Sequence, residues 1–208
     1  MSGKLNGKVA VITGGSAGIG LAIAKRFAAE GATVFITGRR QAALDAAVKT
    51  IGPQALGVCG DSTKPADLDR LYDAVRDKVG RLDVVVANAG FGEAAPFGAI
   101  SEAHFEKSFT ANVKGTLFAA QKALPLLQDD GAIILIGSII TTRAVPGFSA
   151  YAASKAAIRS FARQWMLDLA PRRIRVNVIS PGPIDTPGLD SLAESEDARR
   201  QFKAQLAG

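Results

Sequence analysis

Tyr151 and Lys155 are the residues of this chain whose types and spacing most directly suggest chemistry. They lie four positions apart in a segment with helical periodicity, so their side chains share one face of a helix, one turn apart. A phenol in water has a pKa of ~10, and a neighbouring ammonium group favours the phenolate. The pair could therefore exchange a proton near neutrality, although a tyrosine and a lysine at this spacing are commonly a surface contact.

Two further polar residues stand out against apolar segments of the chain. Ser138 follows an apolar run at 132–136 that predicts a buried strand. Asn112 interrupts the apolar face of a helix predicted at 101–128, which Pro125 should kink near its end. In an open parallel sheet, ligands bind beyond the carboxyl ends of the strands, which is where Ser138 would lie. Asparagine within a helix is ordinarily a weak helix former tolerated on a surface.

Residues 8–30 predict a strand, a tight turn and a helix that could hold a phosphate group. The run at 9–12 is apolar throughout, as in a strand buried on both faces, and glycines 14, 18 and 20 follow it. The next helix would point unpaired N–H groups and the positive end of its dipole into this turn. The pattern indicates a dinucleotide site, with a glycine-rich loop that binds no ligand as the alternative.

Taken together, these residues resemble those of a known family. The turn reads T-G-x-x-x-G-x-G, and Asn112, Ser138, Tyr151 and Lys155 follow it in order, each on the expected element. This set is similar to that of the short-chain dehydrogenase/reductases, over residues 8 to about 186. The resemblance implies an NAD(P)(H)-dependent oxidoreductase of the carbonyl reductase or oxoacyl reductase type.

The resemblance also implies a role for each of the four residues. Hydride transfer to a ketone leaves negative charge on oxygen, so Tyr151 would act as general acid in reduction and as general base in oxidation. Lys155 would tune Tyr151 and bind the nicotinamide ribose. Ser138 would orient the carbonyl oxygen, and Asn112 would hold a water that relays protons to Lys155. A second hypothesis is a dinucleotide-binding regulator of the same fold without turnover, although such a protein has no need of a proton donor.

The residues after the second predicted strand favour one dinucleotide over the other. An acidic residue there would accept the 2′-hydroxyl of NAD, whereas an arginine accommodates the 2′-phosphate of NADP. The chain has Gly38, Arg39 and Arg40 at this place, with no carboxylate between Glu30 and Asp45. We therefore expect NADP(H) to be favoured and NAD(H) to be possible. The alternative for both arginines is a solvated helix start.

Further cofactor contacts are implied at the ends of other strands. Asp61 would bond the adenine amino group, unless it only begins a helix. Asn88 and Gly90, within an N-A-G motif, would shape the floor under the cofactor. After the sixth strand, the Ile184 backbone and the Thr186 hydroxyl would fix the nicotinamide carboxamide. The complete predicted cofactor site comprises Thr13, Gly14, Ser16, Gly18, Ile19, Gly20, Arg39, Asp61, Asn88, Gly90, Tyr151, Lys155, Pro181, Gly182, Ile184 and Thr186.

The alternation of strands and helices defines the expected fold. Strands are predicted at 9–12, 32–37, 55–60, 83–87, 132–136 and 174–179, and helices after the glycine turn and at 40–51, 65–79, 101–128 and 150–170. This order predicts a single α/β domain of the Rossmann type, a doubly wound parallel sheet with helices on both faces. Residues 1–186 would form the cofactor and catalytic core, and 187–208 a mobile substrate-loop or helical segment.

Composition narrows the class of protein. At 208 residues, 48% of them hydrophobic, the chain suits one domain with a substantial core. A single cysteine and a single histidine leave little basis for a disulfide or a metal site. The net charge of +6 comes from scattered basic residues, which does not favour nucleic acid as a partner. No signal core or membrane-length apolar run is seen, so a cytoplasmic protein is expected.

The substrate and the assembly are less defined by the sequence. The substrate would be a small carbonyl compound or alcohol, but the segments around 92–98, 140–148 and 185–205 show no pattern that defines a pocket. Phe118 and Trp165 belong to apolar helix faces that could pair in a homodimer or homotetramer, with burial on their own sheet as the alternative.

The carboxyl-terminal end departs from the family pattern. Members of the family usually continue through another helix and a seventh strand, so we expect the chain to be truncated. Its sixth strand would then present a long apolar edge.

Overall fold

The computed structural model describes residues 3–190 together with residues 197, 200 and 204. Six parallel strands form one sheet in the order β3-β2-β1-β4-β5-β6. The strands are β1 (Val9–Ile12), β2 (Thr33–Gly38), β3 (Ala55–Cys59), β4 (Leu82–Ala87), β5 (Leu127–Ile136) and β6 (Arg175–Ile179). The α-helices are α1 (Gly18–Ala29), α2 (Gln41–Ile51), α3 (Pro65–Lys78), α4 (Glu102–Phe109), α5 (Gly115–Ala123), α6 (Ser149–Asp168) and α7 (Pro187–Asp190). The predicted doubly wound α/β fold is confirmed.

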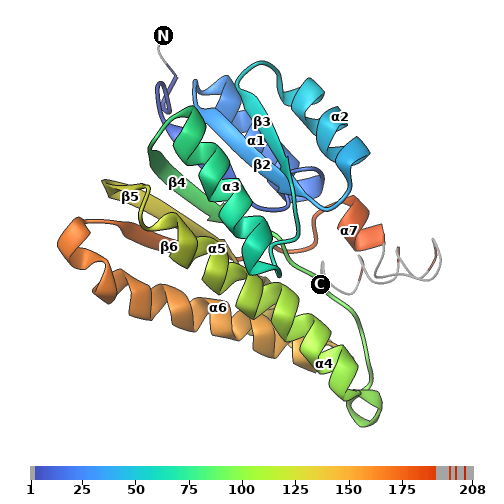
Figure 1. Cartoon of the computed structure of the whole chain (residues 1–208). Helices are drawn as coiled ribbons and strands as arrows, with labels where there is room; N and C mark the ends of the chain where they lie inside the picture. The colour runs from blue at the N-terminus through green and yellow to red at the C-terminus, as the bar shows by residue number, and fades with distance from the viewer. Residues whose placement is uncertain (1–2, 191–196, 198–199, 201–203, 205–208) are drawn as a thin grey trace.

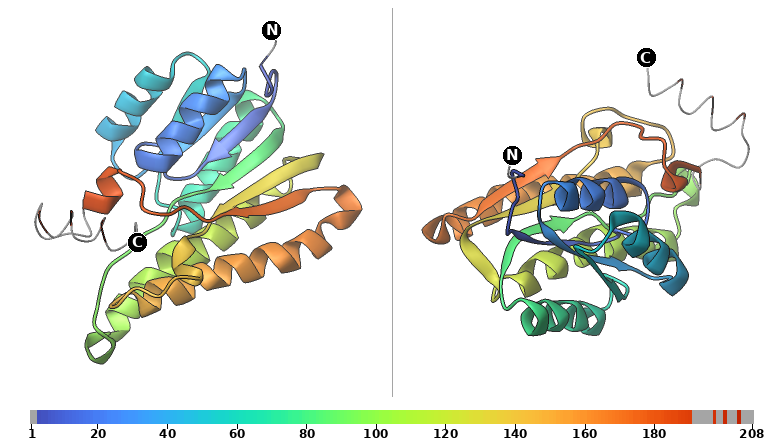
Figure 2. Two further views of the ribbon diagram at one scale, coloured as in Figure 1. Left: turned by 180° about the vertical axis from the view of Figure 1, so that it is seen from behind. Right: turned by 90° about the horizontal axis from the view of Figure 1, so that it is seen from above.

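Helices cover both faces of this sheet (Figures 1 and 2). Helices α1 and α2 pack on one face, where a cluster of buried residues includes Ile12, Ala24 and Leu44. Helices α3, α5 and α6 pack on the other face, around a larger cluster that includes Leu71 and Ile158. The core therefore consists of two apolar layers separated by the sheet, as expected when a parallel sheet is covered on both sides.

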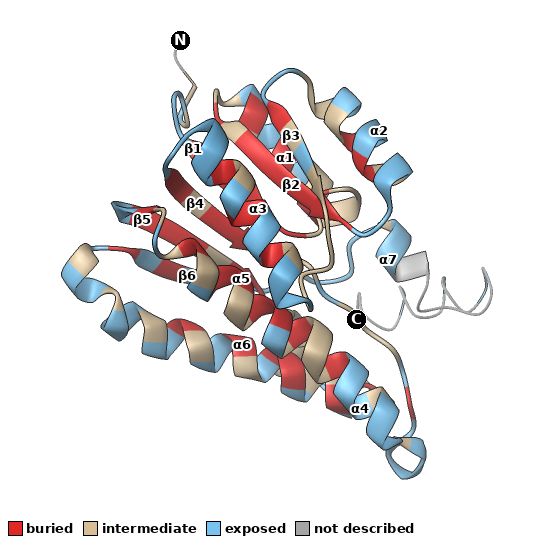
Figure 3. Ribbon diagram, in the orientation of Figure 1, coloured by how far each residue is buried: buried red, intermediate tan, exposed pale blue. Residues whose placement is uncertain are grey.

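The strands differ in how deeply they are buried (Figure 3). Every residue of β1 is buried, which agrees with its uninterrupted apolar sequence. Strand β6 instead alternates, with Val176 buried against the core and Arg175, Asn177 and Ile179 exposed. Within the described residues β6 lies at the edge of the sheet, but its exposed side is only partly apolar.

The helix predicted at 101–128 is confirmed as far as Ala123 and is wrong only over its last five residues. Helix α4 runs into a π-helical turn, η2 (Thr110–Lys114), in which the N–H of Gly115 donates to the carbonyl of Thr110, and α5 then ends at Ala123. Pro125 lies in the turn after α5 and does not kink a continuing helix. Strand β5 begins at Leu127, and its pairing with β4 is irregular before the regular stretch that starts at Ala132.

The carboxyl ends of the central strands meet along one edge of the sheet. Ala87 of β4 pairs with Leu135 of β5, and Ile136 of β5 pairs with Ile179 of β6. Residues directly after these strands are consequently brought together, as the sequence predicted. Of the predicted segment 187–208, only α7 and three isolated residues are described, so its mobility lies outside the described residues.

Candidate active site

A cavity of about 260 Å³ opens at the carboxyl ends of β4, β5 and β6. Ser138, Tyr151 and Lys155 all line it, although they come from the end of β5 and from α6. The structure thus brings the predicted proton-transfer residues to one place. Predicted cofactor residues from other elements share this cavity: Ile19, Asn88, Gly90, Pro181, Gly182, Ile184 and Thr186.

Lys155 is a buried cation anchored at the base of the cavity. Its side chain is on the inner face of α6, with only 5% of the residue exposed, and its Nζ donates to the carbonyl of Ile136 at 2.9 Å. Burial lowers the pKa of Lys155 from 10.5 to about 8. The Nζ atom lies 5.8 Å from the centre of the Tyr151 ring, which places the two side chains on one side of the helix as their spacing predicted.

The pKa of Tyr151 is not lowered by Lys155 in this structure, contrary to the expectation from the sequence. Burial raises the pKa of its phenol above 10, and a hydrogen bond with the Ser138 side chain acts in the opposite direction without overcoming burial. The amine of Lys155 is not among the causes of the shift in this structure. The physical reason is that desolvation disfavours both charged forms, the phenolate and the ammonium, when the two groups are buried together.

Ser138 is held by the turn that follows β5. It precedes a short 3-10 helix, η3 (Ile139–Thr141), and its Oγ accepts a hydrogen bond from the Ile140 N–H at 3.2 Å. This contact uses a lone pair of the hydroxyl and leaves its hydrogen available to a partner in the cavity.

Asn112 does not line the cavity but lies directly behind it. Its residue is 0% exposed, inside the π-helical turn η2. Its Oδ1 accepts the Phe91 N–H and its Nδ2 donates to the Phe91 carbonyl, both at 2.8 Å, and Nδ2 also donates to Ser154 Oγ at 2.9 Å. Both amide hydrogens are therefore in use, and only one lone pair of Oδ1 remains for a water.

Gly90 lies close to both Asn112 and Lys155. A Cβ at this position would lie 3.0 Å from Asn112 Oδ1 and 3.2 Å from Lys155 Nζ. The amide oxygen and the ammonium group therefore both border the space that a side chain at position 90 would enter, and a larger residue would push one of them aside.

The glycine turn is built for close backbone packing. Gly14 and Gly18 have positive φ angles of 65° and 53°, which side chains rarely allow. A Cβ on Gly20 would lie 2.4 Å from the Gly14 carbonyl oxygen. The Thr13 hydroxyl accepts the N–H groups of Asn88 and of the next residue, each at 3.0 Å, and so ties the end of β1 to the end of β4.

The amino end of α1 fits an anionic group. Ala17 precedes the helix and offers no side-chain cap, and no acidic residue occupies the first turn. The first N–H groups of the helix therefore keep no side-chain partner and could bind a pyrophosphate. Ser16 lies in the same turn against Gly38, where an added Cβ would come within 2.6 Å of the serine Oγ. These features fit the predicted dinucleotide.

The loop after β6 returns to the glycine turn. The Pro181 carbonyl accepts the Ile139 N–H at 3.1 Å, and a Cβ on Gly18 would lie 3.3 Å from the side chain of Thr186. Residues 181–186 therefore close one side of the cavity, which is where a nicotinamide contact was predicted.

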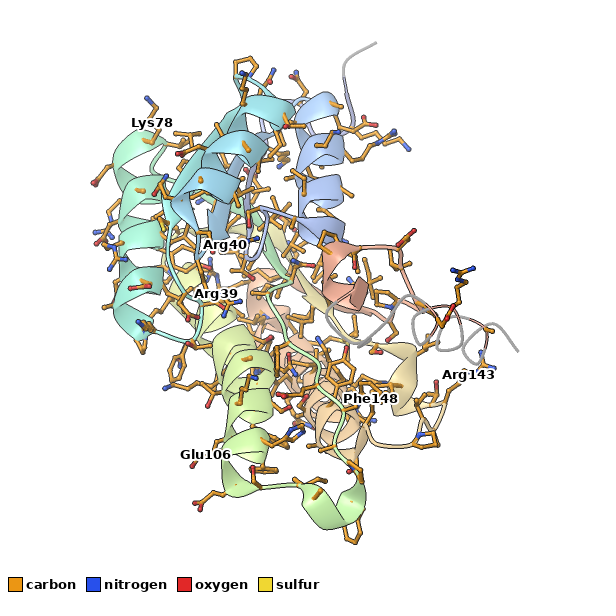
Figure 4. The ribbon with its side chains drawn as sticks, turned by 90° about the vertical axis from the view of Figure 1, so that its right-hand side faces the viewer. Arg39, Arg40, Lys78, Glu106, Arg143 and Phe148 are labelled. Atoms are coloured by element: carbon orange, nitrogen blue, oxygen red, sulfur yellow. The ribbon has the colours of Figure 1, made fainter. Side chains whose placement is uncertain are left out.

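The predicted adenosine contacts lie away from the cavity. Arg39 and Arg40 are exposed after β2, at a distance from Arg143 and Phe148 in Figure 4. Neither arginine forms an ion pair with a residue in the part of the chain that the structure describes. Asp61 Oδ1 accepts both the N–H and the hydroxyl of Thr63, each at 2.9 Å, so the carboxylate organises the turn before α3 and keeps its other oxygen for a ligand.

The wall of the cavity contains residues that the sequence did not identify individually. Phe148 is buried and packs edge-on against the Tyr151 ring, with centroids 6.1 Å apart and an interplanar angle of 72°. Much of this wall lies in 140–148, a segment that was expected to contribute but carried no readable pattern. The additional lining residues are Phe91, Gly92, Ile136, Gly137, Ile139, Ile140, Arg143, Val145, Phe148, Pro183 and Gly188.

Two other kinds of site are absent from the residues that the structure describes. No group of three or more His, Cys, Asp or Glu side chains that could hold a metal ion occurs among the described residues. None of the helices described is long and apolar enough to cross a membrane.

Residues 8–197 match the family described as short chain dehydrogenase. The chain belongs to this family, which confirms the resemblance seen in its motifs. It is therefore an oxidoreductase of the short-chain dehydrogenase/reductase class, a family that binds NAD(P)(H).

Individual relatives include an oxidoreductase, a protein named for binding a nucleotide, and a reductase of known structure. The chain is 53% identical over 204 residues to oxidoreductase asL5 of Sarocladium schorii, with 97% of this chain and 82% of the relative covered. It is 40% identical over 190 residues to the cyclic-di-GMP-binding biofilm dispersal mediator protein of Escherichia coli, covering 88% and 76%. A 3-ketoacyl-(acyl-carrier-protein) reductase of Brucella melitensis, solved in complex with NADH, superposes with a TM-score of 0.87 at 33% identity, covering 91% of this chain and 80% of the other.

Proposed function

We propose that the protein reduces a small carbonyl compound with NADPH, and that Tyr151 is the proton donor. The observation that carries the proposal is the shared cavity: Ser138, Tyr151 and Lys155 line one space together with Ile19, at the amino end of the uncapped helix α1. A dinucleotide held on the glycine turn would supply the hydride. The working direction follows from the reduced state of the NADP pool in cells.

Each side chain has a specific task in this proposal. Ser138, whose hydrogen is free of the Ile140 contact, donates to the carbonyl oxygen and orients it. Tyr151 then protonates the oxygen as negative charge develops there. The phenol is protonated at neutral pH, as a general acid must be, although burial raises its pKa and so makes it a weaker donor until a positive charge is nearby. In the reverse direction the same group would need the help of a nearby positive charge.

Lys155 supplies that charge and binds the cofactor. With a pKa of about 8, it is mostly protonated at pH 7. One of its three hydrogens is donated to the Ile136 carbonyl, which leaves two for the nicotinamide ribose hydroxyls and for a water. We assign that water to the remaining lone pair of Asn112 Oδ1, which borders the same space beside Gly90 as the lysine Nζ.

The preference for NADP(H) over NAD(H) is part of the proposal. Its support is the exposed Arg39, directly after β2, whose planar guanidinium could pair with a 2′-phosphate. The bound NADH of the Brucella neighbour belongs to that protein and leaves the preference of this chain to be measured. Kinetics with both dinucleotides would decide it.

The cavity favours an apolar substrate. Its wall is formed mainly by hydrophobic side chains, among them Phe91, Ile140, Val145 and Phe148. The cationic groups that line it are Lys155 and Arg143. We propose a ketone or an oxoacyl thioester whose apolar body packs on this wall while its carbonyl oxygen lies between Ser138 and Tyr151.

A second candidate function is a dinucleotide-binding regulator without turnover. One observation favours it: the Escherichia coli relative, at 40% identity, is named for binding cyclic-di-GMP. The retained Ser138, Tyr151 and Lys155 favour the enzyme, because binding alone needs no buried phenol. A regulator would bind a nucleotide and turn over none of the carbonyl compounds offered.

We further propose that the protein forms a homodimer or homotetramer in the cytoplasm. Trp165 and Phe118 are only partly buried, on helices α6 and α5, and Met166 and Leu167 are exposed beside them. Light scattering after size exclusion would show a monomer if these surfaces do not pair.

The experiment that tests the main proposal is a turnover assay. The purified chain is incubated with NADPH and a panel of ketones and oxoacyl thioesters, and the loss of NADPH absorbance is followed. Turnover that depends on the carbonyl compound supports the oxidoreductase. Tight dinucleotide binding without turnover of any panel member would support the regulator instead.

A further inference from the structure

Ser154 is a buried serine between Tyr151 and Lys155 whose hydroxyl connects two parts of the site. It lies on α6 with 0% of the residue exposed. Its Oγ donates to the carbonyl of Tyr151 at 2.7 Å and accepts from Asn112 Nδ2 at 2.9 Å. The hydroxyl thus joins the helix of the predicted proton donor to the π-helical turn that carries Asn112.

The direction of these hydrogen bonds is fixed by counting hydrogens. A serine hydroxyl has one hydrogen, and that of Ser154 is given to the Tyr151 carbonyl, so Oγ can offer only a lone pair to Asn112. The nitrogen of the Asn112 carboxamide must therefore face α6. The oxygen accepts the Phe91 N–H at 2.8 Å, and the second hydrogen of Nδ2 goes to the Phe91 carbonyl at 2.8 Å, so the Phe91 backbone supports the same orientation.

This orientation determines which atom of Asn112 faces the lysine. Asn112 Oδ1 and Lys155 Nζ lie 3.0 and 3.2 Å from the same point beside Gly90, the position that a Cβ would take. If the carboxamide turned over, its NH2 group would face the ammonium group instead. Such an arrangement places two donors together and removes the acceptor next to the lysine.

We propose that Ser154 is a positioning residue, which holds the Asn112 carboxamide so that its oxygen faces Gly90 and Lys155. The hydrogen-bonding part of this inference stands on the structure alone, and its effect on turnover rests on the proposed function. The alternative is that the Ser154 hydroxyl only forms a hydrogen bond with the Tyr151 carbonyl of its own helix, as serines within helices often do, and has no influence on Asn112.

A double-mutant cycle distinguishes the positioning role of Ser154 from a hydroxyl that bonds only its own helix. Ser154→Ala should lower kcat about 10-fold and leave the dinucleotide KM nearly unchanged, because the residue acts on Asn112 and not on the cofactor. In the Asn112→Ala background the same change should have little further effect. If the losses from Ser154→Ala and Asn112→Ala multiply, Ser154 does not act through Asn112 and the proposal is wrong.

Three variants serve as references. Ser154→Thr keeps the hydroxyl and should recover most of the lost turnover, whereas Ser154→Cys keeps the size without a strong hydrogen bond and should resemble Ser154→Ala.

Ser108→Ala is the matched control: Ser108 is also 0% exposed, on the neighbouring helix α4, and its Oγ has no hydrogen-bond partner in the described part of the chain. Removing it should leave kcat unchanged. Equal losses from Ser108→Ala and Ser154→Ala would point to packing alone and overturn the proposal.

A second measurement does not depend on activity. The asparagines of the chain are Asn6, Asn88, Asn112 and Asn177, so nitrogen-15 labelling of asparagine gives a simple spectrum of side-chain amides, assigned with Asn112→Ala. The Asn112 amide hydrogens should exchange slowly with water in the wild type and at least ~10-fold faster in Ser154→Ala, or in Ser154→Cys if the alanine variant does not fold.

Turnover and amide exchange together distinguish failure of the positioning role from failure of the proposed function. Unchanged exchange of the Asn112 amide would contradict the positioning role even in an active enzyme. Faster exchange in a protein that reduces no carbonyl compound would support the positioning role and contradict the proposed function.

Discussion

The Nζ of Lys155 donates a hydrogen bond to the carbonyl of Ile136 at 2.9 Å, which ties the buried lysine of α6 to the last residue of β5. The lysine is therefore not a mobile surface cation. It is held where the strand ends, with a defined number of hydrogens left for a ligand, and burial lowers its pKa to about 8.

Replacing this lysine should stabilise the fold while abolishing its chemistry. Lowering the pKa from 10.5 to about 8 corresponds to a cost of about 3 kcal/mol for the charged form. Lys155→Met removes that cost but leaves the Ile136 carbonyl without its donor, so we expect a net gain of ~1–2 kcal/mol in the free energy of unfolding at pH 7.

The gain in stability from Lys155→Met should depend on pH. Because the folded-state pKa is depressed, the cost is present in full below pH ~8 and is relieved between pH ~8 and ~10.5, where the unfolded chain still holds the proton. The stability advantage of Lys155→Met over the wild type should therefore shrink from pH 7 to pH 10 in urea titrations. The exposed Lys49→Met is the control and should show no such trend. A Lys155→Met protein that is less stable at pH 7, by an amount independent of pH, would contradict the account.

Cofactor preference should depend on Arg39. Arg39→Asp places a negative charge where the 2′-phosphate of NADP would lie and offers an acceptor to the 2′-hydroxyl of NAD, so the ratio of kcat/KM for NADPH over NADH should fall at least ~10-fold. Arg40→Asp carries the same change of charge one residue away and should have a smaller effect. An unchanged ratio in Arg39→Asp would show that this arginine does not contact the phosphate.

Turnover should be sensitive to any side chain at position 90. In Gly90→Ala the new Cβ would lie 3.0 Å from Asn112 Oδ1 and 3.2 Å from Lys155 Nζ, so one of them must move. A misplacement of this size should lower kcat at least ~10-fold. Gly98→Ala provides the comparison, because a Cβ there has no atom within 4 Å and should leave turnover as it is. Both variants should melt within a few degrees of the wild type. Full activity in Gly90→Ala would contradict the described geometry.

Much of the fold and the centre of the site could be predicted because they depend on local patterns. Tyr151 and Lys155 share a helix face by their spacing alone, and Ser138 reaches the same edge because it follows a parallel strand. The glycine turn was recognisable because positive φ angles and close packing require glycine at fixed positions.

What could not be predicted depends on contacts between distant segments. The apolar periodicity of the helix at 101–128 continued through Leu124 and Leu126 into β5, so periodicity alone did not mark the end of α5 at Ala123. The cavity wall from Ile139 to Phe148 is a loop without periodicity, and its place depends on how it folds over α6. The pKa of Tyr151 was misjudged because the sequence gives the neighbours of a group but not its burial.

The most direct test of the central claim is the turnover of Tyr151→Phe. This change removes the proposed proton donor and keeps the ring that packs against Phe148. Dinucleotide affinity, measured by NADPH fluorescence, should be preserved. The kcat for carbonyl reduction should fall at least ~100-fold.

The second tyrosine of the chain is the matched control. The Tyr72 hydroxyl is buried and donates to the Ala119 carbonyl, and neither residue lines the cavity, so Tyr72→Phe should reduce stability and leave kcat within about 2-fold of the wild type. A loss of ~100-fold or more in Tyr151→Phe alone is the result that the account predicts. Turnover in Tyr151→Phe comparable to that of the wild type would contradict it.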